Sequence, residues 1–391
     1  MIKKSFQYRL YPNDEQATLL DKHFGSARWL WSWALAEKIR VYEEKGESLS
    51  RFKLQAQIPE MKRTERPWLA EVNAQSLQAS LLFLDRAFMN FFKHKTKFPR
   101  FKKKNHRQSF QVPQRGQLDF ENCKLIIPKF LEGIRCHISR RFEGETKTFT
   151  VSKTTTGKYF VSVLVETPDE VPEKRPVTED TTIGIDVGIK DFCTLSTGEK
   201  VENPRHLKEE LKRLKVLQRR ASKKKKGSSN RKKAVLKVAK LHEKISNRRN
   251  DFLHKLTHRL TSENQIGSIA VEDLNIAGMM KNHCLAQAIS DVSWSEFNRQ
   301  LEYKCEWRGV NLLKIGRFEP SSRTCDACGT VNKDLKLSDR TWTCACGTEH
   351  DRDYLAARNI KRFALTNDNL KYSGQGLPGE PVETRCCNGG R

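Results

Sequence analysis

The sequence predicts a multidomain α/β protein, and three observations support this fold class. Two nearly all-apolar segments, IGIDVG (183–188) and IGSIAVEDL (266–274), are typical of strands buried on both faces of a sheet. Segments with the helical spacing of apolar residues lie around them. A polar, proline-bearing segment at 167–180 indicates the main domain boundary. With 391 residues, the chain is long enough for two or three domains with cores of their own.

The amino-terminal part is expected to be a strand followed by helices. Alternating apolar residues predict a strand over 2–11. Asn13 is the expected N-cap of a helix that runs to about Phe24, where Gly25 can end it. A second helix is expected in ARWLWSWALAEKI, so that residues 13–95 are mainly helical.

A further helix is expected from about Asn73 to Lys93, before a β-rich region at 111–166. Its apolar stripe consists of Leu77, Leu81, Leu84, Phe88 and Phe92.

Beyond the linker, the strand IGIDVG is followed by DFCTLSTG (191–198), an expected hairpin partner. Two long basic helices are expected in 205–261, and IGSIAVEDL then returns to strand. A helix from about Trp294, a strand in VNLLKIG and a helix from about Asp353 to Ala364 complete the region.

The charge of the chain indicates a polyanionic partner. The net charge is +26, from 73 Lys and Arg against 47 Asp and Glu. Nucleic acid is the first candidate and an anionic membrane surface the second. No apolar run reaches about 18 residues, so no membrane span is expected. The start MIKKSFQYRLYP lacks the apolar core of a signal peptide, which favours a cytoplasmic, reduced protein. Eleven cysteines there suggest metal ligands and buried thiols more than disulfides.

Four cysteines form two close pairs on either side of a hairpin-like segment: Cys325, Cys328, Cys344 and Cys346. Two such pairs supply the four thiolates of a structural zinc site, which leaves no open position for catalysis. Gly329 and Gly347 permit the tight turns that such a site needs. The second pair is C-x-C instead of C-x-x-C, so His350 is an alternative fourth ligand. We therefore predict one structural Zn²⁺.

Three carboxylates occupy positions that suggest a second metal site. Asp186 stands inside a buried strand and Glu272 ends another, so each charge needs a partner or a metal. A surface position at the strand end is the alternative for Glu272. Asp353 lies at an expected helix start, where capping is the alternative. The motif HDRD also contains Asp351, and spacing does not choose between the two aspartates.

The order of elements around these carboxylates matches an RNase H-like fold. Such a fold gathers acids from strand ends and from a late helix, and these hold two divalent ions about 3.5–4 Å apart. Carboxylates favour Mg²⁺, with Mn²⁺ as an alternative. The expected chemistry is phosphodiester hydrolysis, with one ion activating water and the other stabilising the leaving 3′-oxygen.

Taken together, the motifs resemble the TnpB family, the RuvC-like proteins of insertion-sequence transposons and relatives of the type V CRISPR nucleases. FQYRLYPNDEQ and FGSARWLWSWAL resemble its amino-terminal signature, and KFPRFKKKNHRQSF its basic loop. GIDVGIKDF, VEDLNI, FEPSSRTCDACG and HDRDYLAARNI resemble its RuvC and zinc-ribbon signatures. The resemblance runs from residue 3 to about 362. It departs at Leu355, where the family commonly has Asn, and at the shortened second cysteine pair.

The resemblance implies a transposon-encoded, RNA-guided DNA endonuclease. Members of the family bind a guide RNA from the transposon end (the ωRNA), recognise a short transposon-adjacent motif in double-stranded DNA, and cut both strands with one RuvC site. The family's catalytic and Mg²⁺-binding residues correspond to Asp186, Glu272 and Asp353.

The resemblance also implies a domain order, in which a β-barrel wedge domain is interrupted by a helical recognition domain. A RuvC nuclease domain follows, with a zinc ribbon for target nucleic acid inserted in it. The expected ranges are 1–12 and 96–178 for the wedge, 13–95 for recognition, 179–318 and 351–365 for the nuclease, and 319–350 for the ribbon. The Gly- and Pro-rich composition of 366–391 is typical of a disordered tail.

Basic side chains are expected to contact the backbone of a guide–target heteroduplex. The candidates are Lys102, Lys103, Lys104, Arg107, residues 223–226, Arg231, residues 232–233, Arg248 and Arg249. Phe98, Phe101 and Phe110 are candidates for stacking on bases, with core packing as the alternative for at least one. Asn73, Gln75 and Gln78 are candidates for reading base edges in the DNA motif. Solvated surface charge is the alternative for the basic runs.

Two other functions are alternatives: an RNA-guided repressor that binds DNA without cleavage, and a DNA transposase that joins strands. The intact carboxylate trio argues against the first, and the family resemblance argues against the second. The sequence does not distinguish a monomer from a homodimer.

Overall fold

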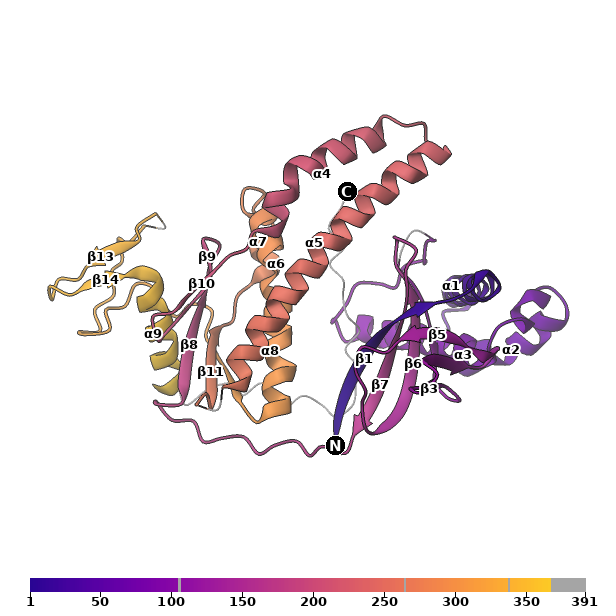
Figure 1. Ribbon diagram of the computed structural model, residues 1–391, viewed down its shortest axis with the longest axis horizontal. Helices are drawn as coiled ribbons and strands as arrows, with labels where there is room; N and C mark the ends of the chain where they lie inside the picture. The colour runs from indigo at the N-terminus through magenta and orange to yellow at the C-terminus, as the bar shows by residue number, and fades with distance from the viewer. Residues whose placement is uncertain (105–106, 264, 337, 367–391) are drawn as a thin grey trace. The chain divides into compact units, whose positions relative to one another are not determined.

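The computed structural model describes residues 1–104, 107–263, 265–336 and 338–366 (Figure 1). The predicted disordered tail lies outside the described residues, apart from Thr366 in the last helix. The chain divides into two compact units, Met1–Glu170 and Val171–Arg391, and the division falls inside the proline-bearing segment at 167–180. No helix in these described ranges is both long and apolar enough to cross a membrane.

The first unit is built on an antiparallel sheet, which in its described part has seven strands in the order β2-β6-β7-β1-β5-β4-β3. The strands are β1 (Ile2–Tyr11), β2 (Gln108–Val112), β3 (Gln117–Asp119), β4 (Lys124–Ile127), β5 (Phe130–His137), β6 (Glu145–Lys153) and β7 (Tyr159–Thr167). The strand predicted at 2–11 is confirmed, and it lies centrally between β7 and β5. Tyr8 and Leu10 alternate into the core. Closure of this sheet into a barrel stays a prediction.

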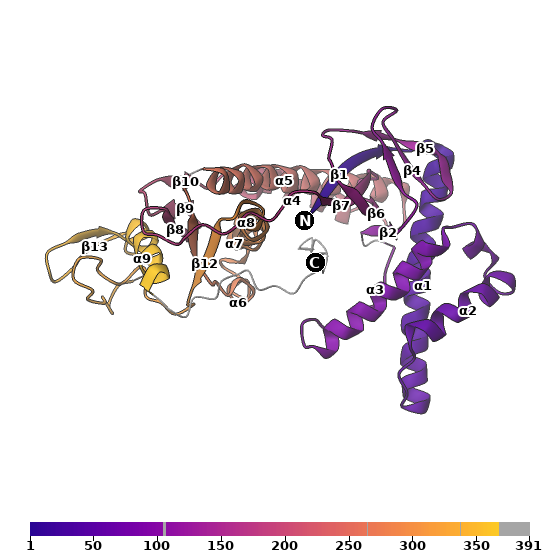
Figure 2. The same ribbon diagram turned by 90° about the horizontal axis from the view of Figure 1, so that it is seen from below.

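Helices are inserted between β1 and β2: α1 (Asp14–Lys45), α2 (Arg51–Arg63), η1 (Pro67–Ala70) and α3 (Ala74–Phe92). Figure 2 shows α1, α2 and α3 grouped together. Asn13 is the N-cap of α1, as predicted, because its side chain accepts a hydrogen bond from the Gln16 N–H at 2.8 Å.

The prediction that Gly25 ends the first helix is wrong, because α1 runs unbroken through it. A glycine inside a helix costs about 1 kcal/mol relative to alanine. The buried face of α1 continues across this position and outweighs that cost; it includes Phe24, Ala27, Leu30, Trp31, Ala34 and Leu35. On α3, the predicted apolar stripe is buried at Leu77, Leu81 and Leu84, but Phe92 is 69% exposed.

The second unit is built on a mixed sheet, whose described residues form five strands in the order β10-β9-β8-β11-β12. The strands are β8 (Thr182–Val187), β9 (Asp191–Leu195), β10 (Lys200–Glu202), β11 (Ser268–Glu272) and β12 (Asn311–Ile315). β8, β11 and β12 are parallel, whereas β9 pairs antiparallel with β8 and confirms the predicted hairpin. The carboxyl ends of the parallel strands therefore meet at one edge, where open α/β sheets commonly bind ligands.

The helices of the second unit are α4 (His206–Ser222), α5 (Ser229–Ser262), α6 (Ile276–Met279), α7 (Ala286–Val292), α8 (Trp294–Arg308) and α9 (Arg352–Thr366). α4 packs on α5 and extends away from the sheet, whereas other helices cover both faces of the sheet (Figure 1). α5 and α8 lie on one face and α9 on the other (Figure 1). Ile185 of β8 shares a core cluster with Leu253 of α5 and Phe297 of α8. Ala270 of β11 shares the opposite cluster with Ile360 of α9. A short hairpin of β13 (Thr341–Thr343) and β14 (Glu349–Asp351) precedes α9.

Candidate active site and metal centre

Two acidic side chains lie at the carboxyl ends of the neighbouring parallel strands β8 and β11. The register pairs Ile185 with Val271, so Asp186 and Glu272 are the next residues along the two strands. Because side chains alternate along a strand, Asp186 lies on the opposite face from Ile185, the face that α9 covers. The strand register therefore places these two carboxylates side by side.

The third acidic side chain, Asp353, reaches the same edge on α9. Gly184, two residues before Asp186, meets α9 so closely that an added Cβ would lie 2.0 Å from the Ala357 carbonyl oxygen and 2.8 Å from the Lys361 backbone nitrogen. Asp353 precedes Ala357 by about one helical turn, so both lie on the face of α9 that meets β8. The close contact at Gly184 therefore sets where Asp353 lies relative to Asp186.

The charges of the three carboxylates influence one another. Burial raises the pKa of Asp186 well above its usual range, and the neighbouring Glu272 and Asp353 raise it further against the opposing effect of Arg352. Burial also raises the pKa of Glu272, although the Ser321 hydroxyl donates a hydrogen bond to its Oε1 at 2.5 Å. A cluster of half-buried like charges is the kind of site that a divalent cation stabilises.

The three carboxylates are spaced more widely than the ligands of a closed metal site. Across the ranges that the structure describes, the donor groups that lie within 4.8 Å of one another include the four cysteines but not this trio. Asp353 is also held by Arg340, whose Nη1 lies 3.3 Å from its Oδ2. We call this arrangement open because the three carboxylates do not form a closed ligand set in the described part of the chain.

Asp351 and Asp353, the two aspartates of HDRD, have different roles. The Oδ1 atom of Asp351 accepts hydrogen bonds from the N–H groups of Asp353 and Tyr354, each at 3.1 Å, and so caps α9. Its Oδ2 pairs with Lys200 Nζ at 2.7 Å. Asp351 therefore serves the helix start, which leaves Asp353 as the acidic group of α9 that influences Asp186.

Sequence reasoning missed the side chains that hold this site together. Besides Ser321, the buried Asn359 of α9 donates from Nδ2 to the carbonyl oxygens of Ser321 and Thr324, at 2.7 and 2.6 Å. These bonds connect α9 to the segment that leads from β12 into the cysteine cluster. FEPSSRT and HDRDYLAARNI contain these residues, but no spacing rule singles out a serine or an asparagine inside them.

The four cysteines predicted to bind zinc form one cluster. Their sulphur atoms all lie within 4.8 Å of one another. The Sγ atoms of Cys325 and Cys346 are 3.7 Å apart, and those of Cys328 and Cys344 are 3.5 Å apart. Tetrahedral zinc with Zn–S bonds of about 2.3 Å needs sulphur atoms about 3.8 Å apart. The shortened C-x-C pair therefore fits a zinc site.

The local structure around the sulphur atoms also suits zinc. Gly329 and Gly347 follow the two pairs with φ of 76° and 86°, the left-handed region that glycine favours. In each turn the first cysteine donates its N–H to the carbonyl of the threonine after the glycine, at 2.9 and 2.8 Å. A hydrogen bond with the Thr330 side chain helps to lower the pKa of Cys328 to about 6, which favours the metal-binding thiolate.

His350, the alternative fourth ligand, lies beside this cluster. Its Nε2 is 3.2 Å from Cys325 Sγ, and its Nδ1 is 3.6 Å from the Asp326 carboxylate. Four sulphur atoms already make a complete ligand set, so the histidine contact fits a role in orienting Cys325. Leu355, where the family commonly has Asn, is buried with Cys325 and Cys344. This departure therefore provides packing between α9 and the ribbon.

Two of the predicted nucleic-acid contacts form bonds within the second unit, and their contact with nucleic acid stays a prediction. Arg231 Nη1 donates to the carbonyl oxygens of Ala221 and Lys224 at 3.2 and 2.9 Å, where α4 ends. Arg249 pairs with Asp291 at 3.0 Å. Residues 223–226, 232–233 and Arg248 are exposed and so keep their side chains at the surface.

The basic loop of the first unit is mostly exposed. Lys103, Lys104 and Arg107 are exposed, and Lys102 lies over the Trp31 ring at 3.9 Å from its centroid. Phe98 and Phe101 are about half-exposed, whereas Phe110 is 3% exposed and belongs to the core. Core packing is therefore the role of Phe110.

The polar candidates at the start of α3 differ in exposure. Asn73 is its buried N-cap, Gln75 is half-buried and bonds Gln114 at 3.2 Å, and Gln78 is exposed.

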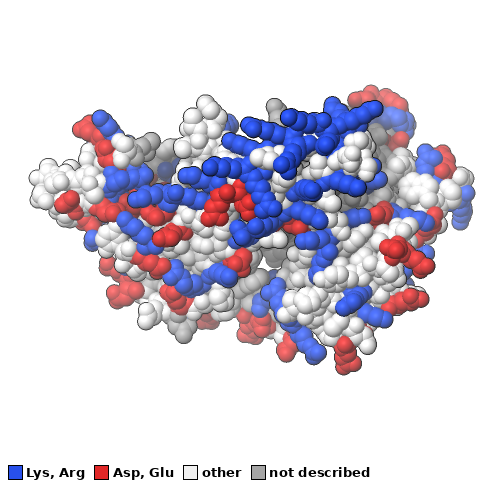
Figure 3. Space-filling model, turned by 45° about the horizontal axis from the view of Figure 1, so that its top comes forward, with Lys and Arg blue, Asp and Glu red and all other residues white. Residues whose placement is uncertain are grey.

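A basic groove between α4 and α5 adds residues that the sequence did not single out. It has a volume of about 820 Å³ and is lined by Lys212, Arg213, Val216, Leu217, Arg220, Lys237, Lys240, Leu241 and Lys244. Figure 3 shows Lys and Arg side chains gathered on the face that carries α4 and α5. Such a surface suits the phosphate backbone of a nucleic acid.

The fold and the site define an α/β protein with a carboxylate cluster at the edge of a mixed sheet and a four-cysteine ribbon before its last helix. Family comparisons follow the same order. Residues 161–283 match OrfB_IS605, described as "Probable transposase", and residues 294–360 match "Cas12f1-like, TNB domain". Residues 1–47 match "Helix-turn-helix domain" of the OrfB_IS605 group, although they form a strand and one long helix. The chain belongs to the TnpB family.

Relatives match over nearly the whole chain. A Streptomyces pristinaespiralis protein named "Putative RNA-guided DNA endonuclease" is 43% identical, over 93% of this chain and 90% of its own. "Putative RNA-guided DNA endonuclease InsQ" of Escherichia coli (strain K12) is 32% identical, over 97% of this chain and 98% of its own. The fold is similar to that in "Cryo-EM structure of the Cas12f1-sgRNA-target DNA complex", with a TM-score of 0.50 and 15% identity, over 95% of this chain and 99% of that one.

Proposed function

We propose that this protein is an RNA-guided endonuclease that cleaves double-stranded DNA by metal-dependent phosphodiester hydrolysis in a single active site. The observation that carries the proposal is the position of Asp186 at the end of β8, where desolvation and the neighbouring carboxylates of Glu272 and Asp353 all raise its pKa. The names of the relatives support an RNA guide and a DNA substrate, as do the sgRNA and target DNA of the Cas12f1 complex.

The topology supports an RNase H-like, RuvC-type nuclease domain in 179–318 and 351–365. Its parallel strands β8, β11 and β12 extend into the antiparallel β9 and β10, and α9 supplies the last acid from the opposite end of the sequence. We assign 319–350 to a zinc ribbon that contacts target nucleic acid. The sheet and the helices of the first unit correspond to a wedge domain in 1–12 and 96–178 and a recognition domain in 13–95.

Each part of the site has a distinct task in this proposal. Asp186, Glu272 and Asp353 would hold two Mg²⁺ ions, with Mn²⁺ as an alternative, and such ions would supply an activated water and charge stabilisation for the leaving 3′-oxygen. The Ser321 hydroxyl fixes the orientation of the Glu272 carboxylate. Arg340 pairs with Asp353 and limits its repulsion of the other carboxylates.

The other surfaces bind and position the nucleic acids. The four cysteines hold one structural Zn²⁺, which fixes the ribbon immediately before α9. The basic groove between α4 and α5 contacts the backbone of the guide RNA or of its heteroduplex with the target, through shape and charge. The guide is an ωRNA from the transposon end, and the DNA carries a short transposon-adjacent motif.

The experiment that tests this proposal uses the protein purified with its RNA. Sequencing that RNA identifies the guide, and a duplex library with a matching target and randomised flanks then serves as substrate with Mg²⁺. We expect double-strand breaks that depend on one flanking motif. Asp186→Ala should lower the cleavage rate by several orders of magnitude, because it removes a metal ligand.

The matched control is Asp273→Asn, since Asp273 is adjacent to Glu272 but pairs on the surface with Arg317 at 3.0 Å. This variant should cut at close to the normal rate. Cleavage by Asp186→Ala at the wild-type rate would overturn the active-site assignment. Binding without Mg²⁺-dependent product would identify an RNA-guided repressor, and strand-joined products would identify a transposase.

A further inference from the structure

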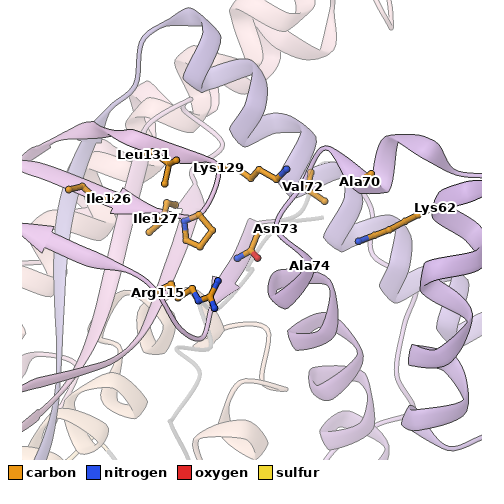
Figure 4. A pocket seen from close by; sticks show the side chains of 11 residues that line it. Lys62, Ala70, Val72, Asn73, Ala74, Arg115, Ile126, Ile127, Lys129 and Leu131 are labelled. Atoms are coloured by element: carbon orange, nitrogen blue, oxygen red, sulfur yellow. The ribbon is translucent and has the colours of Figure 1, made fainter.

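The charged side chains that line a cavity in the first unit are all cationic. It has a volume of about 410 Å³ and lies where α2 ends, α3 begins and β4 turns into β5. Figure 4 shows Asn73 near its centre, with Arg115 and Lys129 on either side and Lys62 on the side of α2. Ile127 and Pro128 contribute apolar wall, and the lining contains no acidic residue among those that the structure describes.

The three cations of this cavity lack carboxylate partners. Within the described ranges no acidic side chain pairs with Lys62, Arg115 or Lys129. Burial lowers the pKa of Lys62, and the nearby charge of Lys129 lowers it further. Arg115 and Lys129 are exposed and Lys62 is half-buried, so three cationic side chains without a carboxylate partner in the described residues border one space that solvent anions can enter.

Asn73 adds a buried donor that has no partner. Its side chain is 7% exposed, and its Oδ1 accepts a hydrogen bond from the Gln75 N–H at 3.1 Å. This bond orients the amide, and Nδ2 is left without a partner in the described part of the chain. The N–H of Asn73 itself donates to His23 Nε2 at 3.1 Å, which anchors the start of α3. The positive end of the α3 dipole lies at the same cavity.

Two of the cationic residues, Arg115 and Lys129, have a backbone with positive φ. Arg115 has φ of 59° and Lys129 has φ of 75°, in the left-handed region where glycine is favoured over residues with a Cβ. Both side chains line the cavity. Strained residues of this kind occur preferentially at ligand sites, where the side chain is needed despite its conformational cost.

We propose that Lys62, Arg115, Lys129 and the Asn73 amide bind one phosphodiester group of the target DNA duplex. The proposal rests on the function proposed above and deepens it. The side-chain groups named here are all donors, so an anion with several acceptor oxygens matches them, and a backbone phosphate supplies such oxygens. Ile127 and Pro128 match the apolar surface of the adjoining deoxyribose.

Duplex DNA is favoured over RNA by the residues that follow on α3. Gln75 and Gln78 lie in its first turns; Gln78 is exposed, and the half-buried Gln75 donates from Nε2 to Gln114 Oε1 at 3.2 Å. Side-chain amides read base edges in the wide major groove of B-DNA, whereas the narrow major groove of A-form RNA excludes them. A bound phosphate next to them would fix the register of the duplex for such readout.

The first measurement is affinity for duplex DNA in the absence of divalent ions, so that cleavage plays no part. The protein–RNA complex first captures its preferred duplex from the flank library by binding alone, without divalent ions, and is then titrated with that duplex at several salt concentrations. Arg115→Gly and Lys129→Gly each remove a cation and permit the positive φ. Each should weaken binding roughly 10-fold and reduce the slope of log K against log salt by about 1. The control Cys123→Gly, at φ of 51° and outside the cavity, should leave both unchanged.

The second measurement locates the phosphate. Single phosphodiesters of the duplex are replaced by neutral methylphosphonates, and one linkage should weaken binding by wild type but not weaken Arg115→Gly further. Three results would each overturn the proposal. They are the absence of such a linkage in the duplex, coupling of Arg115 only to linkages of the guide RNA, and a site that binds inorganic phosphate but no duplex phosphate. Because these measurements need no cleavage, they stand apart from the Asp186→Ala test of the nuclease.

Discussion

The two candidate metal centres of the second unit differ in how they are formed. The cysteine cluster comes from one short stretch of chain, two similar turns, and its sulphur atoms already lie at zinc-binding separations. The carboxylate cluster comes from two strands and a distant helix, and its donor atoms are more widely spaced. The first arrangement is closed and suits a structural ion. The second is open and retains like-charge repulsion that bound cations would relieve.

Removing one sulphur should produce the largest effect and would show that the closed site maintains the fold. Closed thiolate sites contribute roughly 10–16 kcal/mol of apparent zinc binding. We expect Cys328→Ser to lower the zinc content from one ion per chain towards zero and to expose the ribbon to hydrogen exchange, while β8 and β11 stay protected. Metal analysis and exchange mass spectrometry measure this. Cys284→Ser, at an exposed free cysteine, is the control, and a full zinc complement in Cys328→Ser would contradict the ligand assignment.

Substituting the two aspartates of HDRD one at a time should distinguish the proposed metal ligand of the open site, Asp353, from the helix cap that supports it, Asp351. Asp353→Asn should lower the cleavage rate about 1,000-fold, or about 4 kcal/mol, because an amide is a poor ligand for Mg²⁺. Asp351→Asn should lower it less than about 3-fold, since asparagine caps helices as well as aspartate does. Single-turnover cleavage at saturating Mg²⁺ gives both values. Equal losses would show that the two roles are assigned wrongly.

Truncating Leu355 should weaken the connection between the two centres. Leu355 is 2% exposed and packs with Cys325 and Cys344 at the start of α9. We expect Leu355→Ala to destabilise the second unit by about 2–4 kcal/mol, the usual cost of a buried leucine. Denaturant unfolding measures this change. Leu131→Ala, at a position 80% exposed, should change stability by less than about 0.5 kcal/mol.

The smallest expected effect is a gain in stability at the open site. Because the pKa of Asp186 is raised in the folded state, the metal-free wild type binds an extra proton and loses stability as the pH rises from about 4 through the raised pKa. Asp186→Asn removes this loss and should be about 1 kcal/mol more stable at pH 8 in EDTA. Thermal melts at pH 5 and pH 8 measure the difference. A pH-independent difference would show that ionisation of the Asp186 carboxyl in the folded state is not its cause.

The same contrast explains how much could be predicted from the sequence. Cys325 and Cys346 belong to a local pattern, so spacing alone predicted their cluster. Asp186 and Glu272 were recognisable because charged groups inside apolar strands need a partner. The choice between Asp351 and Asp353 depended on hydrogen bonds to two backbone N–H groups, which no spacing rule contains.

Other features depended on tertiary contacts and were missed for that reason. Asn359 and Ser321 hold the site through bonds between residues distant in sequence. Arg231 and Arg249 looked like surface charges, but the partners that engage them come from neighbouring helices. The local propensity of Gly25 predicts a helix end, but the buried face of α1 continues past this residue and keeps the helix intact.

In the proposed nuclease, the contact between Gly184 and α9 provides a way to lose cleavage without any change in the three carboxylates. The backbones of β8 and α9 meet there with no room for a methyl group. An alanine at this position would move the helix away from the strand and carry Asp353 with it. A relative with such an alanine would keep all three acidic residues and would look like an active nuclease, although it could only bind its nucleic acids.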